Sequence, residues 1–565
     1  MYLRKTKRKN KNGTTTEYYQ LAHNERDIKT KKPVAHIIHS FGRADQLDHN
    51  SLVRLCRSIA RVCGLNVVEH DTRLERKVDW PKDVKQIKTF EFGTVLIIET
   101  LWEKLGIGEA LRKIMKEKGC KAQHERALLA MTANRLCDPE SKLGVWDRWL
   151  SKVYLPSCKG LSLDNIYEGM DFFHDYAEEV EESVFFHTAN LFNLEVDLIF
   201  YDTTTASFAI DEEDEDDEEN DEEGLRKYGR SKEGTWGPQV VIALAVTKEG
   251  LPVRTWVFPG NTSDFETILR VRKDLRGWKL GRALFVADSG MNSEENRKEL
   301  SRACGKYLLA TRMVSVTEVK KDVLSKRGRY RVIKDNLQAK EVIIGDGERR
   351  RRYILCYNPH EAERQRRHRE KVVKILETEL KSHPEKKATA QWAIELLASL
   401  RYKRYLRITE NGEVAINRQA IFDTQRYDGK WVIETNDDTI SFEDAACGYK
   451  GLMVIEQCFR SLKRSQLKMS PMYHWVPRRI ETHIRICVLA LLIQRAAEIG
   501  SKKSWHQIRN VLQGLQATEY HTPNYIFFRR NELQKVLIAE LNMLEIPVPT
   551  SVLKIEPLPL NENYA

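Results

Sequence analysis

Three acidic residues stand out because of the segments that carry them. Asp202 follows an apolar run in LIFYDTTTASF, and Asp288 ends the apolar run ALFVAD. Glu456 lies within GYKGLMVIEQCFRSLKRSQL, residues 448–467, whose apolar spacing is that of a helix. A buried carboxylate is costly unless it is capped, paired or bound to a metal. These three positions are therefore the first candidates for chemistry.

The predicted helix 448–467 has two different faces. Its apolar positions recur at the spacing of a buried stripe, namely Leu452, Ile455, Phe459 and Leu462. A phenol, a carboxylate, a guanidinium and an ammonium fall close to one line on the other face, namely Tyr449, Glu456, Arg460 and Lys463. One helix can therefore present an acid together with groups that bind phosphate.

The chemistry of the three acids depends on whether they meet. If Glu456 faces Asp202 and Asp288, the carboxylates repel one another and one of them takes up a proton. Two Mg²⁺ ions about 3.5–4 Å apart, with Mn²⁺ as a substitute, would remove this repulsion and activate a water or a 3′-hydroxyl at a phosphodiester. Neither GxxxxGK[ST] nor GxGxxG occurs in the sequence, so we expect no nucleotide cofactor.

Each candidate also has a plainer interpretation. Asp202 could cap a turn at the end of a strand, and the threonines 203–205 are common strand residues. Tyr449 and Lys463 could lie on the solvated edge of a helix. Trp431 could pack in a small β-rich core.

The pattern around these residues predicts an α/β fold. Five strands are expected, at residues 196–202, 239–247, 253–258, 283–288 and 307–312, with a tight turn at KEG between the second and third. Helices are expected at 265–277, with Ser263 or Asp264 as N-cap, and at 293–305. This order indicates a mixed sheet with helices on its faces.

The rest of the chain supplies further segments. We expect a basic β-meander at 1–50, a helical DNA-binding region at 51–195 that includes a helix at 52–63, core segments at 196–312 and 446–500, a β-rich insertion at 313–445, and a helical tail at 501–565 for dimerisation. The helix at 360–380 is strongly basic, and its candidates for phosphate contact are Arg364, Arg367 and Lys371. A solvated surface helix is the alternative.

The charge of the chain favours a polyanionic partner. The formal net charge is +11, although residues 211–223 contain twelve acids in one run. Without that run the chain would carry +23. A body of this sign attracts nucleic acid, while simple solubility is the other interpretation. The acidic run is most simply a disordered loop, or a mimic of DNA that shields the basic surface.

Composition also limits the compartment. The ten cysteines are scattered, which predicts a reduced cytoplasmic protein without structural zinc or disulfides. The basic start lacks the apolar segment of a signal peptide. The longest apolar run, 486–493, is too short to span a bilayer, so no membrane partner is expected.

Three motifs give a family resemblance. YDTTTASF, VADSG and YKGLMVIEQCFRSLK, in this order, resemble the DDE transposases of bacterial insertion sequences, in the branch with a β-rich insertion and a Y-x2-R-x3-E-x6-K signature. The resemblance implies a ribonuclease-H-like core in which Asp202, Asp288 and Glu456 bind metal. It also implies that Tyr449 and Lys463 contact DNA phosphates and that Trp431 stacks on a base of a distorted DNA end.

One signature position differs. The arginine of the signature falls on Leu452, and Arg460 is our candidate to replace it.

The resemblance further implies a function. We expect metal-dependent cleavage and strand transfer at the ends of the element that encodes the protein, acting on double-stranded DNA as a homodimer. A DNA-binding derivative without catalysis and a metal-dependent nuclease without strand transfer remain the alternatives.

Overall fold

The structure is a computed structural model that divides into two compact units, Met1–Val84 and Lys85–Ala565. It describes residues 2–9, 15–26, 33–44, 84–120, 123–194, 196–216, 224–278, 280, 283–302, 305–383, 385 and 387–558. The helix predicted at 52–63 lies outside these residues, as does the second half of the acidic run.

The first unit contains a three-stranded antiparallel sheet. Its strands are β1 (Tyr2–Lys9), β2 (Thr15–Arg26) and β3 (Pro33–Arg43), in the order β1-β2-β3. The chain here is a β-meander, in which each strand pairs with the next.

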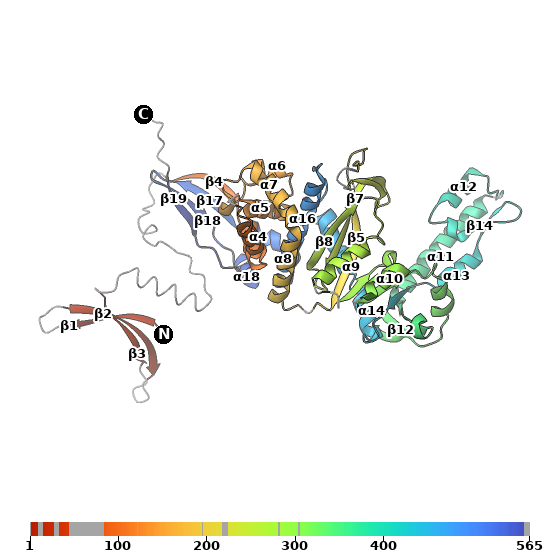
Figure 1. Ribbon diagram of the computed structural model, residues 1–565, viewed down its shortest axis with the longest axis horizontal. Helices are drawn as coiled ribbons and strands as arrows, with labels where there is room; N and C mark the ends of the chain where they lie inside the picture. The colour runs from red at the N-terminus through yellow and green to blue at the C-terminus, as the bar shows by residue number, and fades with distance from the viewer. Residues whose placement is uncertain are drawn as a thin grey trace. The chain divides into compact units, whose positions relative to one another are not determined.

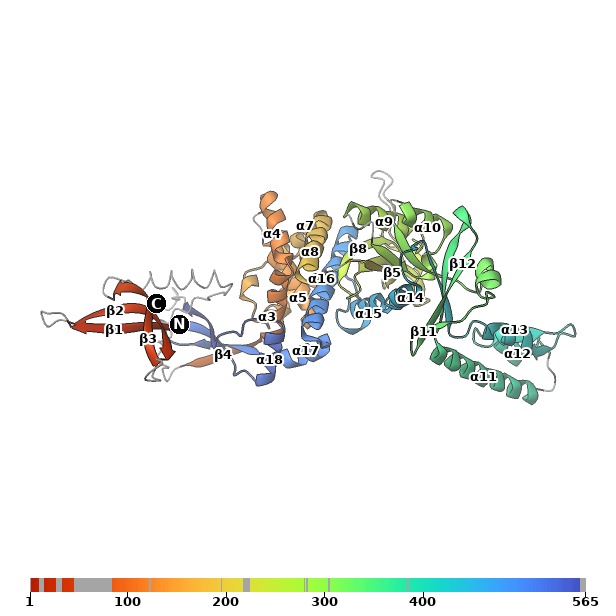
Figure 2. The same ribbon diagram turned by 90° about the horizontal axis from the view of Figure 1, so that it is seen from below.

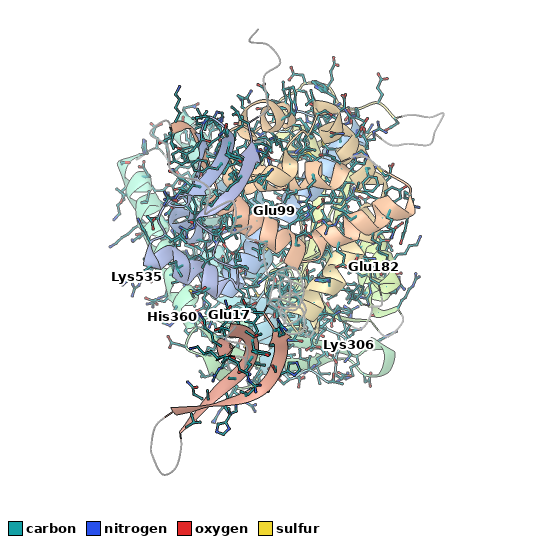
Figure 3. The ribbon with its side chains drawn as sticks, turned by 90° about the vertical axis from the view of Figure 1, so that its left-hand side faces the viewer. Glu17, Glu99, Glu182, Lys306, His360 and Lys535 are labelled. Atoms are coloured by element: carbon teal, nitrogen blue, oxygen red, sulfur yellow. The ribbon has the colours of Figure 1, made fainter. Side chains whose placement is uncertain are left out.

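The second unit begins with a strand and then becomes helical. β4 (Lys85–Glu91) lies within the region expected to be helical, so that expectation was wrong there. The helices that follow are α3 (Gly93–Lys104), α4 (Ile107–Glu117), α5 (His124–Cys137), α6 (Lys142–Gly144), α7 (Leu163–Asp175) and α8 (Ala177–Leu191). Glu99 on α3 and Glu182 on α8 carry charge on this part of the unit (Figure 3).

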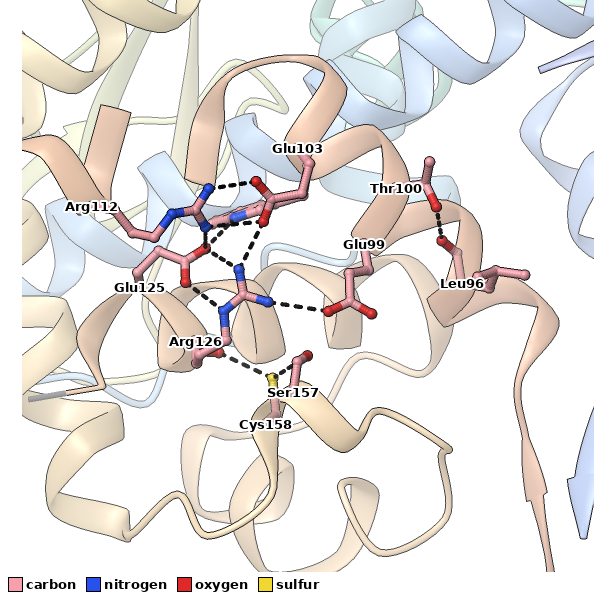
Figure 4. Close-up of polar contacts among 10 residues, drawn as sticks. Leu96, Glu99, Thr100, Glu103, Arg112, Glu125, Arg126, Ser157 and Cys158 are labelled. Carbon is pink, nitrogen blue, oxygen red and sulfur yellow. Dashed lines mark hydrogen bonds and ion pairs between the residues drawn. The ribbon is translucent and has the colours of Figure 1, made fainter. Parts of the chain in front are cut away.

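An ion-pair network joins α3 and α5. Arg126 lies 3.1 Å from Glu99 and 2.9 Å from Glu103, and it also pairs with Glu125 (Figure 4). The buried indole of Trp102 donates a 2.6 Å hydrogen bond to Glu125. These contacts fix the helices side by side, because each charge finds a partner on a neighbouring helix.

The helical part packs on a ten-stranded sheet. The order is β11-β12-β13-β16-β10-β9-β5-β7-β6, with β8 also paired to β7. Figure 1 shows β5, β7 and β8 side by side in this sheet. The core strands are β5 (Leu198–Ser207), β6 (Lys227–Arg230), β7 (Trp236–Val246), β8 (Pro252–Pro259), β9 (Leu284–Ala287) and β10 (Lys306–Thr311). β5, β7 and β8 are antiparallel, whereas β9 is parallel to β5 and β10 is parallel to β9. This is the ribonuclease-H-like mixed sheet that the resemblance implies.

Side chains alternate between the two faces of β5. Ile199 and Tyr201 pack with helices α9 (Thr267–Gly277) and α10 (Glu294–Ser301). Phe200 packs on the opposite side, in the core that includes α14 (Phe442–Lys450), α15 (Met453–Arg460) and α16 (Pro477–Ser501). Helices therefore cover both faces of the sheet (Figure 2). Because the side-chain period of a strand is two, Asp202 points to the same face as Phe200.

The segment after β10 extends the same sheet and also contains helices. Its elements are β11 (Arg331–Lys334), β12 (Leu337–Ile344), β13 (Arg351–Tyr357), α11 (Pro359–Ser382), α12 (Gln391–Ala398), β14 (Leu406–Ile408), β15 (Val414–Ile416), α13 (Arg418–Gln425) and β16 (Lys430–Thr435). β16 is antiparallel to both β10 and β13. The insertion is thus continuous with the sheet of the core.

The end of the chain differs from the helical tail that we expected. α17 (Trp505–Leu512) and α18 (Lys535–Met543) alternate with β17 (Gln516–His521), β18 (Tyr525–Arg530) and β19 (Val552–Pro557). These strands and β4 form a sheet in the order β19-β18-β17-β4. The tail is therefore mixed in structure. Its strand β17 pairs with β4, which lies far earlier in the chain. Among the described residues, no helix is long and apolar enough to cross a membrane.

Candidate active site

Asp202 lies inside a strand and not at its end. β5 continues to Ser207, and Asp202 is opposite Leu244 of β7. The strand continues because the threonines 203–205 are buried. The carboxylate of Asp202 accepts a 2.8 Å hydrogen bond from the backbone N–H of Thr203. The interpretation of Asp202 as a turn cap does not agree with this position.

The environment of Asp202 disfavours its charge. Burial, and then the negative charges of Asp264 and Asp288, raise the pKa of Asp202 to about 7, although the Thr203 N–H and Lys232 act in the opposite direction. A carboxyl group with this pKa is ready to gain a cation or a proton near neutral pH.

Asp288 follows β9 directly and is exposed. Since β9 is parallel to β5 and next to it, the second acid lies beside the first at the same part of the sheet. The hydroxyl of Tyr449 is 3.4 Å from Asp288 and donates to it. Burial and the nearby charges of Asp288, Asp202 and Glu456 raise the pKa of Tyr449, so the phenol keeps its proton and remains a donor.

Glu456 lies on α15, and its side chain is exposed. The predicted apolar stripe is confirmed, since Leu452, Ile455, Phe459 and Leu462 are all buried. The helix itself differs from the prediction, because residues 448–467 form the end of α14, then α15, then a π-helical turn at Ser461–Ser465. The break falls at Gly451, where a Cβ would lie 2.7 Å from the ring of Phe200.

A fourth acid near the site was missed by sequence reasoning. Asp264 was predicted as an N-cap, but α9 begins at Thr267. Asp264 instead accepts a hydrogen bond from the hydroxyl of Thr203 and pairs with Lys232 at 2.5 Å. An acid ahead of a helix has the pattern of a cap, and only the fold shows that it faces the sheet.

The donor chemistry of this site suits a divalent cation only in part. Asp202 and Asp288 are neighbouring carboxylates, one of them desolvated, and oxygen ligands of this kind are what Mg²⁺ prefers. Yet within the described ranges no three or more acidic, histidine or cysteine side chains are arranged so that they could hold a metal ion. The structure thus brings Asp202, Asp288 and Tyr449 together but does not close a three-acid site with Glu456.

Comparison with known proteins identifies the family. The model of the IS1634 family transposase N-terminal domain matches residues 3–69. The model of the transposase DDE domain matches residues 207–493, just over half of the chain. The chain belongs to the DDE transposases. The DDE match includes Asp288 and Glu456 and begins five residues after Asp202.

Two further comparisons add little to this family assignment. A solved structure described as the cryo-EM structure of piggyBac transposase synaptic complex with hairpin DNA aligns with 10% sequence identity and a TM-score of 0.33, over 74% of this chain and 79% of that chain. No curated protein matches the transposase.

Two cationic residues of the transposase that follow α15 share one acidic partner. Lys463 is 3.4 Å from the hydroxyl of Thr204 and 3.2 Å from Glu233, which also pairs with Arg464. Arg460 is exposed at the end of α15. Leu452 is buried, so no phosphate contact can come from the position of the signature's arginine.

The predicted DNA contacts of the insertion have varied surroundings. Arg364 pairs with Glu361 at 2.7 Å and Arg367 with Glu363 at 2.7 Å, while Lys371 is exposed. Arg367 and Lys371 line a groove of about 1230 Å³. Trp431 is half-buried on β16 and packs against the main core. The contact of these four residues with DNA stays a prediction.

Proposed function

We propose that the transposase cleaves DNA at the ends of its own insertion sequence and joins those ends to target DNA in a metal-dependent reaction. The observation that carries the proposal is the Asp202 carboxyl, desolvated within the sheet, with its pKa raised towards neutrality beside Asp288. Acids whose pKa is perturbed in this way are typical of catalytic sites.

The roles follow from the surroundings of Asp202 and Asp288 and, for Glu456, from the family resemblance. Asp202 and Asp288 lie beside each other, and with Glu456 as the third acid they would hold two Mg²⁺ ions, which would supply an activated nucleophile and stabilise the leaving oxygen. The Tyr449 hydroxyl orients Asp288 by donating to it. Lys463 and Arg460 would bind DNA phosphates, for which Lys463 must exchange its partner Glu233 for a phosphate oxygen.

The remaining parts of the proposal concern partners. The basic helix α11, with Arg364, Arg367 and Lys371, would contact the DNA backbone, and Trp431 would lie near a distorted end. Since two ends must be held together, we propose a homodimer on DNA. Light scattering of the complex with a short element end measures the number of protein chains per complex.

The test uses purified protein, Mg²⁺ or Mn²⁺, and a labelled duplex that carries one element end. A joined product supports the proposal, a cut product alone indicates a nuclease, and binding alone indicates a derivative without catalysis. Asp288→Asn should abolish cutting and joining while DNA binding is retained.

The matched control is Glu295→Gln, which removes one exposed acid on α10 close to Asp288 in sequence. This variant should cut as the wild type does. Cleavage by the Asp288→Asn variant at the wild-type rate would reject the assignment of the site.

A further inference from the structure

A second cavity, separate in its lining residues from the acidic site, is rich in cations. Its volume is about 740 Å³, and it lies between the connection from α5 to α6 and the segment that leads into α16. The residues that matter for its chemistry are Arg135, Lys142, Lys468, Tyr473, His474 and His483.

The most unusual group in this cavity is the buried side chain of Lys142. Its side chain is only 4% exposed, and its ammonium group has no hydrogen-bond partner among the described residues. Burial and the neighbouring Arg135 lower the pKa of Lys142 to about 7. A buried amine without a partner is expensive, because it has lost its hydration and gained nothing in return.

The other buried groups, Arg135 and His483, also form no ion pair with an acid in the described part of the chain. Arg135 is 4% exposed, donates to the carbonyls of Glu140 and Lys468, and leaves its Nε without a partner in the described structure. His483 donates from Nε2 to the carbonyl of Met469 at 2.9 Å, and its Nδ1 has no described partner.

The acid among the residues that line this cavity is already engaged. The carboxylate of Glu140 pairs with Arg148 at 2.7 Å, so it does not neutralise Lys142. The positive surroundings are felt by His474, since burial and the charges of Lys142, Arg479 and Arg135 lower its pKa to about 4. An oxyanion placed between Lys142 and Arg135 would supply the missing negative charge.

The mouth of the cavity indicates which oxyanion. Lys468, Tyr473 and Arg148 are exposed there, so cations and an aromatic ring surround the opening. The volume is far larger than one free phosphate ion requires and suits a group that belongs to a longer chain. We infer that this pocket binds a backbone phosphate of DNA, with Lys142 and Arg135 as its donors and Tyr473 and Lys468 beside the adjoining nucleotide.

The inference rests on the proposed function only in that DNA is the ligand, so it is tested by binding and not by cleavage. Lys142→Met keeps the length of the side chain and removes the charge. Its affinity for a short duplex should fall about tenfold, as expected for a lost charge-assisted contact. Its binding should also depend less on salt, with the slope of log K against log salt smaller by about 0.9.

Stability separates binding from damage to the fold. Because the variant buries a methionine where an unpartnered amine was, its melting temperature should equal or exceed that of the wild type. Lys113→Met, at an exposed position of α4, is the control for charge loss and should bind as the wild type does. Should Lys142→Met fail to fold, Lys468→Glu at the exposed mouth is the second variant, and it should weaken binding by repulsion.

The outcomes are distinct. Weaker DNA binding by a stable Lys142→Met protein supports the inference, whether or not the wild type cleaves DNA. Unchanged affinity of both variants overturns it. Thermal stabilisation of the wild type by inorganic phosphate, with unchanged DNA affinity of the variants, would assign the pocket to free phosphate and overturn the DNA assignment.

Discussion

Removing the charge of Asp202 should make the transposase more stable at high pH. The folded state raises the pKa of this carboxyl from 3.8 to about 7, because it is buried and faces other acids. The folded state therefore holds a proton that the unfolded state releases. For an acid whose pKa is raised on folding, stability is lost as the pH rises from the unfolded pKa to the folded pKa.

The size of the effect follows from the shift. One pKa unit is about 1.4 kcal/mol, so the raised pKa of Asp202 lowers the free energy of unfolding by about 4 kcal/mol at pH 8, where the folded carboxyl is ionised, and by about 2 kcal/mol at pH 5, where it still holds its proton. Asp202→Asn removes this term and retains an oxygen that can accept from the Thr203 N–H. The free energy of unfolding should rise by these amounts.

Urea unfolding at pH 8 and pH 5, with EDTA present and followed by circular dichroism, measures both values. Glu295→Gln, at an exposed acid on α10, is the control, and its free energy of unfolding should change by no more than about 0.5 kcal/mol. A variant at position 202 that is no more stable than the wild type at pH 8, or equally stabilised at both pH values, would refute the reasoning about its burial.

Three further substitutions test contacts described above. Tyr449→Phe removes the donor to Asp288, and single-turnover cleavage should slow about tenfold at unchanged melting temperature, since a positioning contact contributes to catalysis and little to folding; an unchanged rate would contradict the positioning role. Glu233→Gln releases Lys463 and Arg464, so nonspecific DNA affinity at low salt should rise about two- to fivefold, and equal affinities of the variant and wild type would show that the ion pairs do not compete with DNA. Asp428→Ala leaves the buried Arg369 without the carboxylate that lies 2.8 Å from it, which should cost about 3–5 kcal/mol and speed proteolysis near α11; resistance equal to that of the wild type would disagree.

The sequence predicted those elements whose burial imposes a period. The strands of the core and the apolar stripe of α15 follow from alternation and from helical spacing, because each has one or two buried faces. The continuation of β5 past Asp202 could not be predicted in this way, since the threonines 203–205 are polar in composition and yet buried.

The other differences depend on contacts distant in the chain. Gln516 of β17 pairs with Glu91 of β4, and a local sequence pattern cannot predict a partner so far away in the chain. The helix break falls at Gly451, which packs on Phe200. The contact of Asp264 with the hydroxyl of Thr203 also depends on how far β5 continues. For the candidate site, the residue types were therefore predictable, but their surroundings were not.

The way the insertion returns to the core has a consequence for protein engineering. β16 lies between β13 and β10, and α14 begins a few residues later at Phe442 with Tyr449 in its last turn. The position of Tyr449 therefore depends on strands of both the core and the insertion. Excising residues 313–435, or exchanging them with those of another transposase, would remove the neighbour that holds the outer edge of β10 and would shift the start of α14. The insertion cannot be treated as a detachable module.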